Sequence, residues 1–197
     1  MKLSIVIPAY NEEDTLPEVL TSICNCFNLK IKETEIIVIN DKSTDGTEKI
    51  LKEFKSWPIN FKYFTNKKNM GHAYSVLRGL KAANGEYVLY MDADNQIKVE
   101  DMYFNSDYDL ISGYREHRQD KLFRKVISFI LKLTIFVRHH IWIKDANCPF
   151  KLFKRERLEF LMALLKDNSV VPSISMEILA RKYGMKTMEI PVDHLPY

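Results

Sequence analysis

Short β-forming runs alternate with segments of helical spacing through the first half of the chain, and this alternation constrains the fold more than any other feature. The β-forming runs are 3–8, 35–40, 60–65 and 86–91. Segments 12–27, 44–54 and 71–83 lie between them and carry apolar residues three or four positions apart, the spacing of one helix face. Uninterrupted apolar runs such as 3–8 are typical of strands buried on both faces of a parallel sheet. The pattern predicts an α/β fold with a mostly parallel central sheet and right-handed crossovers.

The second half is less regular, but it continues the same architecture. Strands are predicted over 109–113, 149–153 and 186–192, and helices over 120–139, 155–165 and 174–183. Asn84-Gly85 is expected to stop the preceding helix in the left-handed conformation that these residues tolerate. A chain of 197 residues without an internal repeat or a linker is expected to form one domain, 1–197.

The composition excludes several classes of protein. Hydrophobic residues make up 46% and charged residues 28%, with a formal net charge of +3, which excludes collagen-like and disordered chains. The three cysteines form an odd set without zinc-site spacing, so we expect reduced thiols in a cytoplasmic protein. The N-terminal apolar run is too short for a secretory signal. The apolar region 127–137 is too short to cross a bilayer, which needs about 20 residues.

Polar residues follow each of the first four predicted strands, at 8–12, 41–45, 66–71 and 92–96. Ligands of open α/β sheets bind at the carboxyl ends of the strands. We therefore expect these four loops to converge on one crevice.

The strongest local signal is Asp92-Ala93-Asp94-Asn95-Gln96, directly after the fourth strand. Two carboxylates at this spacing, with an amide nearby, can share a hard cation such as Mg²⁺ while leaving coordination positions for substrate phosphates. The alternative is an ordinary turn, because Asp is a favoured turn residue.

A second acidic loop, Asp41 to Gly46, follows the second predicted strand. Asp41 can accept a hydrogen bond from the base or ribose of a nucleotide, whereas one Asp of this loop can equally cap the next helix. The chain has neither a Gly-x-Gly-x-x-Gly motif after the first strand nor a P-loop. Their absence disfavours a dinucleotide-dependent oxidoreductase and a P-loop protein.

Together these motifs resemble a known family. They are Pro8-Ala9-Tyr10-Asn11-Glu12-Glu13, Asp41-x-Ser43-x-Asp45-Gly46, Asn69-x-Gly71, Asp92-Ala93-Asp94-x-Gln96 and Asp145-x-Asn147-Cys148-x-Phe150-Lys151. In this order they resemble the inverting family 2 glycosyltransferases of GT-A fold, a Rossmann-like three-layer fold, and among them the dolichyl-phosphate mannose synthase-like polyprenyl-phosphate sugar transferases. The resemblance implies a half that binds nucleotide sugar and metal, 1–98, and an acceptor-side half, 99–197.

The resemblance also implies roles for individual residues. Nucleotide-sugar binding would involve Pro8, Tyr10, Glu12, Asp41, Asp45, Gly71, Asp92 and Ala93. A Mg²⁺ or Mn²⁺ ion would be held by Asp92, Asp94 and Gln96. Catalysis would involve Asp94, Arg115, Asp145 and Lys151. Lys151 would face a phosphate, and Asp145 would lie near the reacting centre, unless it is only a carboxylate that caps a helix or forms a turn.

The implied reaction moves a sugar from a GDP-sugar or UDP-sugar to a polyprenyl phosphate, dolichyl or undecaprenyl. A lipid phosphate is already anionic near neutral pH, so it needs no strong base, whereas a sugar hydroxyl needs a carboxylate such as Asp145 to take its proton. Two alternatives stay open. One is transfer to a saccharide hydroxyl in polysaccharide or glycoprotein assembly, and the other is a non-catalytic subunit that binds nucleotide sugar.

Segment 114–144 is the basic region of the chain. It holds eight Lys and Arg residues and two acidic residues, a net charge of +6. Its predicted helix, 120–139, gathers Arg124, Lys125, Ser128 and Lys132 in one polar wedge. Such a helix lies in an anionic membrane interface, or packs on the sheet with its basic edge in solvent.

We therefore expect peripheral contact with the cytoplasmic face of a membrane, aided by a membrane-anchoring partner or by homo-oligomerisation. Nucleic acid is not an expected partner, because the cations alternate with aliphatic residues instead of stacking aromatic ones.

Overall fold

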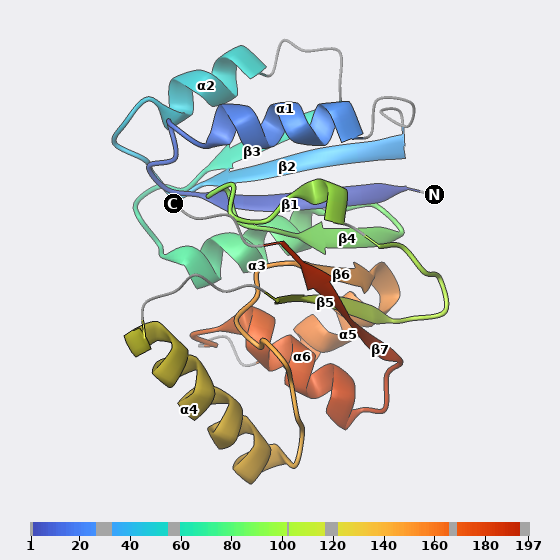
Figure 1. Ribbon diagram of the computed structural model, residues 1–197. Helices are drawn as coiled ribbons and strands as arrows, with labels where there is room; N and C mark the ends of the chain where they lie inside the picture. Colours follow the sequence, from blue (N-terminus) through green and yellow to red (C-terminus); the bar gives the residue numbers. More distant parts are fainter. Residues whose placement is uncertain are drawn as a thin grey trace.

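The computed structural model describes residues 2–26, 33–54, 60–101, 103–116, 122–165 and 169–193. Its centre is a seven-stranded sheet in the order β3-β2-β1-β4-β6-β5-β7 (Figure 1). The strands are β1 Leu3–Ala9, β2 Thr34–Asn40, β3 Asn60–Thr65, β4 Tyr87–Tyr90, β5 Leu110–Arg115, β6 Lys151–Lys154 and β7 Thr187–Val192. The helices are α1 Leu16–Cys26, α2 Thr47–Phe54, α3 His72–Ala82, α4 Leu122–His139, α5 Arg155–Leu164 and α6 Pro172–Lys182, with a short 3-10 turn at Val99–Asp101.

The first four strands are parallel, so the predicted mostly parallel sheet is confirmed. β1 lies between β2 and β4, with Leu3 opposite both Thr34 and Tyr87, and β3 extends the sheet beyond β2. β5 and β7 are parallel to each other. β6 runs antiparallel between β4 and β5. The chain returns to the edge where β5 ends, at the contact between Arg115 and Asp145, and so enters β6 in the opposite direction.

Helices cover both faces of the sheet and make three layers (Figure 1). Alternate side chains of β1 enter different cores. Ile5 and Ile7 pack with Leu16 of α1 and Leu51 of α2, whereas Val6 packs with α3, α5 and α6 on the opposite face. Burying an aliphatic side chain of this size stabilises the fold by about 1.5–3 kcal/mol. The predicted three-layer α/β fold is thus confirmed.

Helices α1 and α2 begin later than the sequence predicts, at Leu16 and Thr47 instead of 12 and 44. The residues before them form two loops that hold each other. The Glu12 N–H donates to Thr47 Oγ1 at 2.9 Å, and the Thr44 N–H donates to Asn11 Oδ1 at 2.8 Å. Because these backbone N–H groups donate across the loops, they do not form helical hydrogen bonds. The loops are thereby held beside the carboxyl ends of β1 and β2.

The predicted left-handed stop after α3 is wrong. The helix ends at Ala82, Ala83 is extended, and neither Asn84 nor Gly85 has a positive φ. Glycine is needed at position 85 for space instead, because a Cβ there would lie 2.6 Å from the backbone nitrogen of Ser4.

Helix α4 stands at one edge of the molecule (Figure 1). Residues 120 and 121 of its predicted range lie outside the described residues, and 122–139 confirm the rest. Ile135 is the one buried side chain among those described in α4, and it packs with Ile143, Ala146 and Ile174. Because Ile174 belongs to α6, this cluster joins α4 to that helix. Within the described ranges, no helix has both the length and the apolarity to cross a bilayer.

Candidate active site

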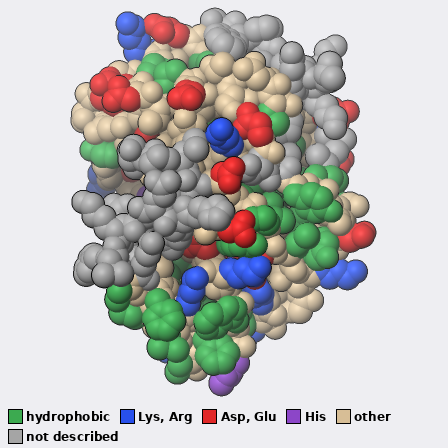
Figure 2. Space-filling model, in the orientation of Figure 1, with side chains coloured by type: hydrophobic (Ala, Val, Ile, Leu, Met, Phe, Trp, Pro, Cys, Tyr) green, Lys and Arg blue, Asp and Glu red, His purple; other side chains and the backbone are tan. Residues whose placement is uncertain are grey.

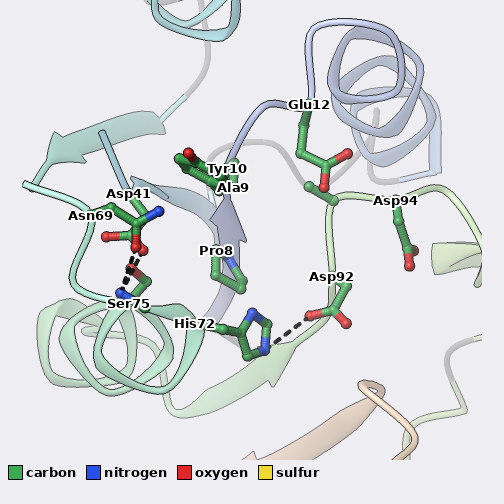
Figure 3. Close-up of a pocket in the computed structure, with 12 residues that line it drawn as sticks. Pro8, Ala9, Tyr10, Glu12, Asp41, Asn69, His72, Ser75, Asp92 and Asp94 are labelled. Carbon is green, nitrogen blue, oxygen red and sulfur yellow. Dashed lines mark hydrogen bonds and ion pairs between the residues drawn. The ribbon is translucent and has the colours of Figure 1, made fainter. Parts of the chain in front are cut away.

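A cavity of about 250 Å³ opens at the carboxyl ends of β1, β2 and β4, beside the start of α3 (Figure 3). It is lined by Pro8, Ala9, Tyr10 and Glu12 after β1, Asp41 after β2, Asn69, Gly71, His72 and Ser75 around the start of α3, and Asp92, Ala93 and Asp94 after β4. The predicted convergence of four loops is therefore confirmed. The cavity gathers every residue assigned to nucleotide-sugar binding except Asp45.

Asp41 is buried at the floor of this cavity and holds the loop after β3 in place. Its Oδ1 accepts hydrogen bonds from Asn66 Nδ2 at 2.6 Å and from the Met70 N–H at 2.8 Å. Its Oδ2 accepts one from the Gly71 N–H at 2.8 Å. Asn66 also donates to Ser75 Oγ at 2.9 Å, so one amide fixes both the carboxylate and the first turn of α3.

Gly71 is the residue before α3 and has φ 88°. Only glycine adopts this conformation without strain from a Cβ. The turn directs the Gly71 N–H toward Asp41, which explains the predicted Asn69-x-Gly71 motif in structural terms.

Three carboxylates crowd the opposite side of the cavity: Glu12, Asp92 and Asp94 (Figure 3). Burial raises the pKa of Asp92 from its ordinary 3.8 to about 6, opposed in part by nearby His72 and reinforced by the charge of Asp94. Burial also raises the pKa of Glu12, with further contributions from Asp94 and Asp45. Ionised carboxylates in this cavity are therefore destabilised by burial and by mutual repulsion, and a bound cation would offset both effects.

His72 lines this side of the cavity, and the buried Tyr90 contacts Asp92 from outside the lining; neither was predicted as a site residue. The Tyr90 hydroxyl donates to Asp92 Oδ1 at 2.9 Å. His72 Nε2 lies 3.0 Å from that hydroxyl and 3.6 Å from Asp92 Oδ1. Tyr90 is the last residue of β4, so its position two residues before Asp92 was the signal available in the sequence.

The residues present fit a divalent metal only in part. Asp92 and Asp94 supply the hard oxygen ligands that Mg²⁺ and Mn²⁺ prefer. Within the described part of the chain, however, no three His, Cys, Asp or Glu side chains are already arranged around a metal position. Gln96 is not among the cavity residues, and its backbone N–H donates to Asp94 Oδ1 at 3.1 Å. A metal here would need oxygen ligands from a substrate, as the diphosphate of a nucleotide sugar supplies.

Asp45 does not line the cavity, and the helix-capping alternative describes it. Its Oδ1 accepts a hydrogen bond from the Thr47 N–H at 3.0 Å, at the start of α2. Its Oδ2 accepts one from the Glu13 N–H at 3.1 Å, in the neighbouring loop. Asp45 supports the loops that carry the site and does not face it.

Arg115 and Asp145 meet at the end of β5, outside the cavity lining. Arg115 Nε donates to Asp145 Oδ2 at 2.7 Å, and a second guanidinium nitrogen donates to Oδ1 at 3.0 Å. Both side chains are largely buried. The two predicted catalytic residues are therefore brought together, as partners in a two-point ion pair.

Lys151 does not face an open site. Its side chain is 0% exposed, and Nζ donates to Glu177 Oε2 at 2.6 Å. Glu177 also accepts hydrogen bonds from Ser112 and Arg181. The prediction that Lys151 faces a phosphate does not hold in this structure, because its ammonium group is enclosed and paired.

The chain belongs to glycosyl transferase family 2. The model of that family matches residues 4–159. Among curated proteins, the chain is 30% identical over 200 residues to the undecaprenyl-phosphate 4-deoxy-4-formamido-L-arabinose transferases of Photorhabdus laumondii subsp. laumondii and Proteus mirabilis. Each match covers 98% of this chain and 60% of the relative. The chain thus spans about three fifths of the length of these relatives.

Solved glycosyltransferase structures share the fold. Mannosyl-3-phosphoglycerate synthase from Rubrobacter xylanophilus has a TM-score of 0.73 at 15% identity, covering 100% of this chain and 67% of that chain. The mannosyltransferase PcManGT from Pyrobaculum calidifontis, in complex with GDP-Man and Mn²⁺, has a TM-score of 0.67 at 20% identity, covering 96% and 55%. These similarities confirm the predicted GT-A fold.

Proposed function

We propose that this chain is a metal-dependent inverting glycosyltransferase that moves a sugar from a nucleotide diphosphate sugar to a polyprenyl phosphate at the cytoplasmic face of a membrane. The observation that carries the proposal is the cavity that gathers Asp41, Asp92 and Asp94 at the carboxyl ends of three parallel strands. The names of the curated relatives, which are undecaprenyl-phosphate sugar transferases, support the same acceptor class.

Asp41 would bind the nucleobase, and its hydrogen bonds favour uracil. A carboxylate offers about four acceptor positions. The Asn66 amide and the Met70 N–H occupy two acceptor positions on Oδ1 of Asp41, and the Gly71 N–H occupies one on Oδ2. The position left on Oδ2 suits the single N3–H donor of uracil, whereas guanine presents two adjacent N–H donors that need both carboxylate oxygens. We therefore favour a UDP-sugar over a GDP-sugar, with the exposed ring of Tyr10 available to stack on the base.

Asp92 and Asp94 would hold Mg²⁺ or Mn²⁺ together with the donor diphosphate. When bound, the ion offsets the negative charge that develops on the departing nucleoside diphosphate. The two carboxylates must be ionised for this role, and the position of Asp94 beside Asp92 keeps their repulsion high until a cation arrives.

The pairing of Asp145 favours a phosphate acceptor over a hydroxyl acceptor. A general base must accept the proton of the attacking group, but both oxygens of Asp145 already accept hydrogen bonds from Arg115. A lipid phosphate needs no such base. Asp145 would instead hold the Arg115 guanidinium at the end of β5 in a two-point ion pair.

Helix α4 would bring the enzyme to the membrane that contains its acceptor. Its exposed apolar side chains are Val126, Ile127, Phe129, Ile130, Leu133, Phe136 and Val137, and Trp142 follows the helix. Figure 2 shows hydrophobic side chains gathered over α4, with Lys and Arg side chains beside them. An apolar face of this extent beside cations suits an anionic lipid interface. Residues 117–121, and the side chains of Arg124 and Lys125, lie outside the described residues.

The metal role is tested by Asp94→Asn. The neutral amide keeps the size of the side chain but removes a charge from the cation site, so transfer should be abolished while thermal unfolding stays cooperative. Asp107→Asn is the matched control, because Asp107 is an exposed carboxylate outside the cavity. Full transfer by Asp94→Asn in Mn²⁺ would remove this carboxylate from the mechanism.

The acceptor is tested with one UDP-sugar donor and two acceptors, a polyprenyl phosphate and an oligosaccharide. Transfer to the lipid phosphate alone is expected. Strict dependence on the oligosaccharide would overturn the proposal in favour of saccharide assembly. Donor binding without transfer or hydrolysis would favour a non-catalytic nucleotide-sugar-binding subunit.

A further inference from the structure

A second cavity, of about 620 Å³, lies beside the candidate active site and is lined by residues of segment 65–78. The two cavities share no lining residue. Asn69, Gly71, His72 and Ser75 line the first, whereas Lys67, Lys68, Met70, Tyr74 and Arg78 line the second. The loop after β3 and the first turns of α3 are therefore a common wall between them.

The second cavity is strongly cationic. Lys67, Lys68 and Arg78 line it, and no carboxylate is among the described residues of its wall. Lys67 and Lys68 make no hydrogen bond or ion pair with other residues in the described ranges. Three cations without a carboxylate partner form a site for an anion, and guanidinium and ammonium groups are the usual protein ligands of phosphate.

Apolar and aromatic groups complete the wall. Tyr74 is 46% exposed and stands one helical turn before Arg78 on the same face of α3. Met70 is exposed beside them. The Arg78 guanidinium lies over the Phe64 ring, 5.4 Å from its centroid, which holds it at the cavity edge. The ligand that fits is an anion that also carries a flat ring, since the Tyr74 ring can stack on it.

We propose that this cavity is a second nucleoside-phosphate site, which binds the nucleoside diphosphate released by the reaction. This inference rests on the proposed function for the identity of the product. Its ring would stack on Tyr74, and its phosphates would contact Lys67, Lys68 and Arg78.

A hydrogen-bond chain joins this site to the donor cavity. Arg78 donates to Asn66 Oδ1, and Asn66 donates to Asp41 Oδ1. A phosphate bound to Arg78 competes with Asn66 for the guanidinium and loosens the amide that fixes Asp41. Occupancy of the second site therefore lowers donor affinity, and by linkage the donor lowers product affinity at the second site by the same factor.

The test is an NMR titration of the ¹⁵N-labelled 197-residue chain with UDP. We expect two sets of saturable amide shifts with different midpoints, one at Gly71 and Asp92 and one at Tyr74 and Arg78. The double variant Lys67→Glu with Lys68→Glu should weaken the second set at least tenfold. It should retain the first set at an equal or lower UDP concentration, because loss of the second site also removes its negative coupling to the first. The control is Lys49→Glu with Lys81→Glu, which changes the net charge equally at exposed lysines outside both cavities, and it should retain both sets.

Shifts at the first set alone would overturn the second site, as would equal weakening in the variant and its control. Shifts at the second set alone would overturn the proposed donor site and keep this one. A parallel titration with inorganic pyrophosphate should shift Arg78 but leave Tyr74 nearly unchanged, because the ring contact needs a nucleoside. Equal responses of both residues to pyrophosphate and UDP would contradict nucleoside recognition.

Discussion

The two halves of the chain hold their polar residues in opposite ways. In the first half, Asp92 and Asp94 face an open cavity at the ends of parallel strands. In the second half, Asp145 is paired with Arg115, and Lys151 is enclosed with Glu177. The apolar residues differ as well, since β1 is fully buried whereas α4 exposes most of its apolar face. The first half thus holds a preformed open cavity, whereas the second is a frame of buried charge pairs that exposes the apolar face of α4.

Removing Lys151 tests that frame and is expected to produce the largest effect. Lys151→Ala removes the ammonium partner of the buried Glu177 carboxylate and leaves the Arg181 guanidinium as a partial replacement, so the cost should lie near the lower end of about 3–5 kcal/mol. Chemical denaturation followed by circular dichroism measures the loss. A double variant, Lys151→Met with Glu177→Gln, should recover most of it, because no uncompensated buried charge remains. Wild-type stability of Lys151→Ala, with loss of transfer only, would instead favour the phosphate-facing role.

Replacing Asn66 tests the preformed site and is expected to have the next largest effect. Asn66→Ala removes one donor to Asp41 and one to Ser75. We expect about a tenfold loss of UDP affinity by calorimetry, since a hydrogen bond to a charged group contributes about 1.5–3 kcal/mol and part is regained by relaxation. In the same variant the preference for UDP over GDP should shrink, because an acceptor position on Asp41 Oδ1 becomes available to guanine.

Asn84→Ala is the control for that experiment. Asn84 lies beyond the opposite end of α3 and lines neither the candidate active-site cavity nor the second cavity. Unchanged UDP affinity in a folded Asn66→Ala variant would show that Asp41 does not depend on its amide partner.

The first half was the more predictable part of the molecule, for a topological reason. Uninterrupted apolar runs predict parallel strands, and parallel strands bring the residues after them to one edge. Tyr10, Asp41 and Asp92 follow such runs, so their meeting needed no knowledge of side-chain packing. Asp45 shows where this argument ends. Whether a loop carboxylate faces the site or caps a helix depends on the backbone of the neighbouring loop, here the Glu13 N–H.

The second half depends on contacts that no local pattern contains. Lys151 and Glu177 are 26 residues apart, and neither the strand pattern of β6 nor the helical spacing of α6 indicates that they pair. Helical periodicity did predict the apolar face of α4, but it could not show that the body of the protein leaves that face uncovered. Asn66 was missed for a similar reason, because a buried amide after a strand has no signature until its partners are known.

The charge of Asp92 is expected to have a smaller, pH-dependent effect on the free energy of unfolding. Folding raises the pKa of Asp92 from 3.8 to about 6, so the folded state favours the protonated carboxyl. The contribution of that carboxyl to the free energy of unfolding is present below about pH 4 and is lost as the pH rises through 6. Asp92→Asn should therefore be more stable than the parent at pH 7.5 by about 1–2 kcal/mol, less than the full shift implies because the side chain is 27% exposed. Thermal melts from pH 4 to 8 measure the difference, which should vanish near pH 4.

Added Mn²⁺ sharpens this experiment. The ion binds the ionised carboxylate and should stabilise the parent but not Asp92→Asn, so the gap at pH 7.5 should narrow. A gap that does not change with pH would show that the ionised carboxylate is not strained in the folded cavity.

The exposed face of α4 is expected to produce the smallest change in stability and a large change in membrane binding. Phe129 and Val137 are 59% and 68% exposed, so Phe129→Asp with Val137→Asp should alter the free energy of unfolding by less than about 1 kcal/mol. Ile135→Ala, at the buried contact with α6, should cost about 2–4 kcal/mol.

Co-flotation with vesicles containing phosphatidylglycerol distinguishes the role of the exposed face of α4 from that of its buried face. The exposed-face variant should lose at least tenfold in vesicle binding while melting like the parent, whereas Ile135→Ala should still bind at temperatures where it is folded. Higher salt should weaken binding of the parent, because the cations beside the apolar face, Lys132, Arg138 and Lys144, are screened. If the exposed-face variant floats like the parent, the apolar surface of α4 serves a protein partner or a second copy instead, and the acceptor must reach the enzyme by another surface.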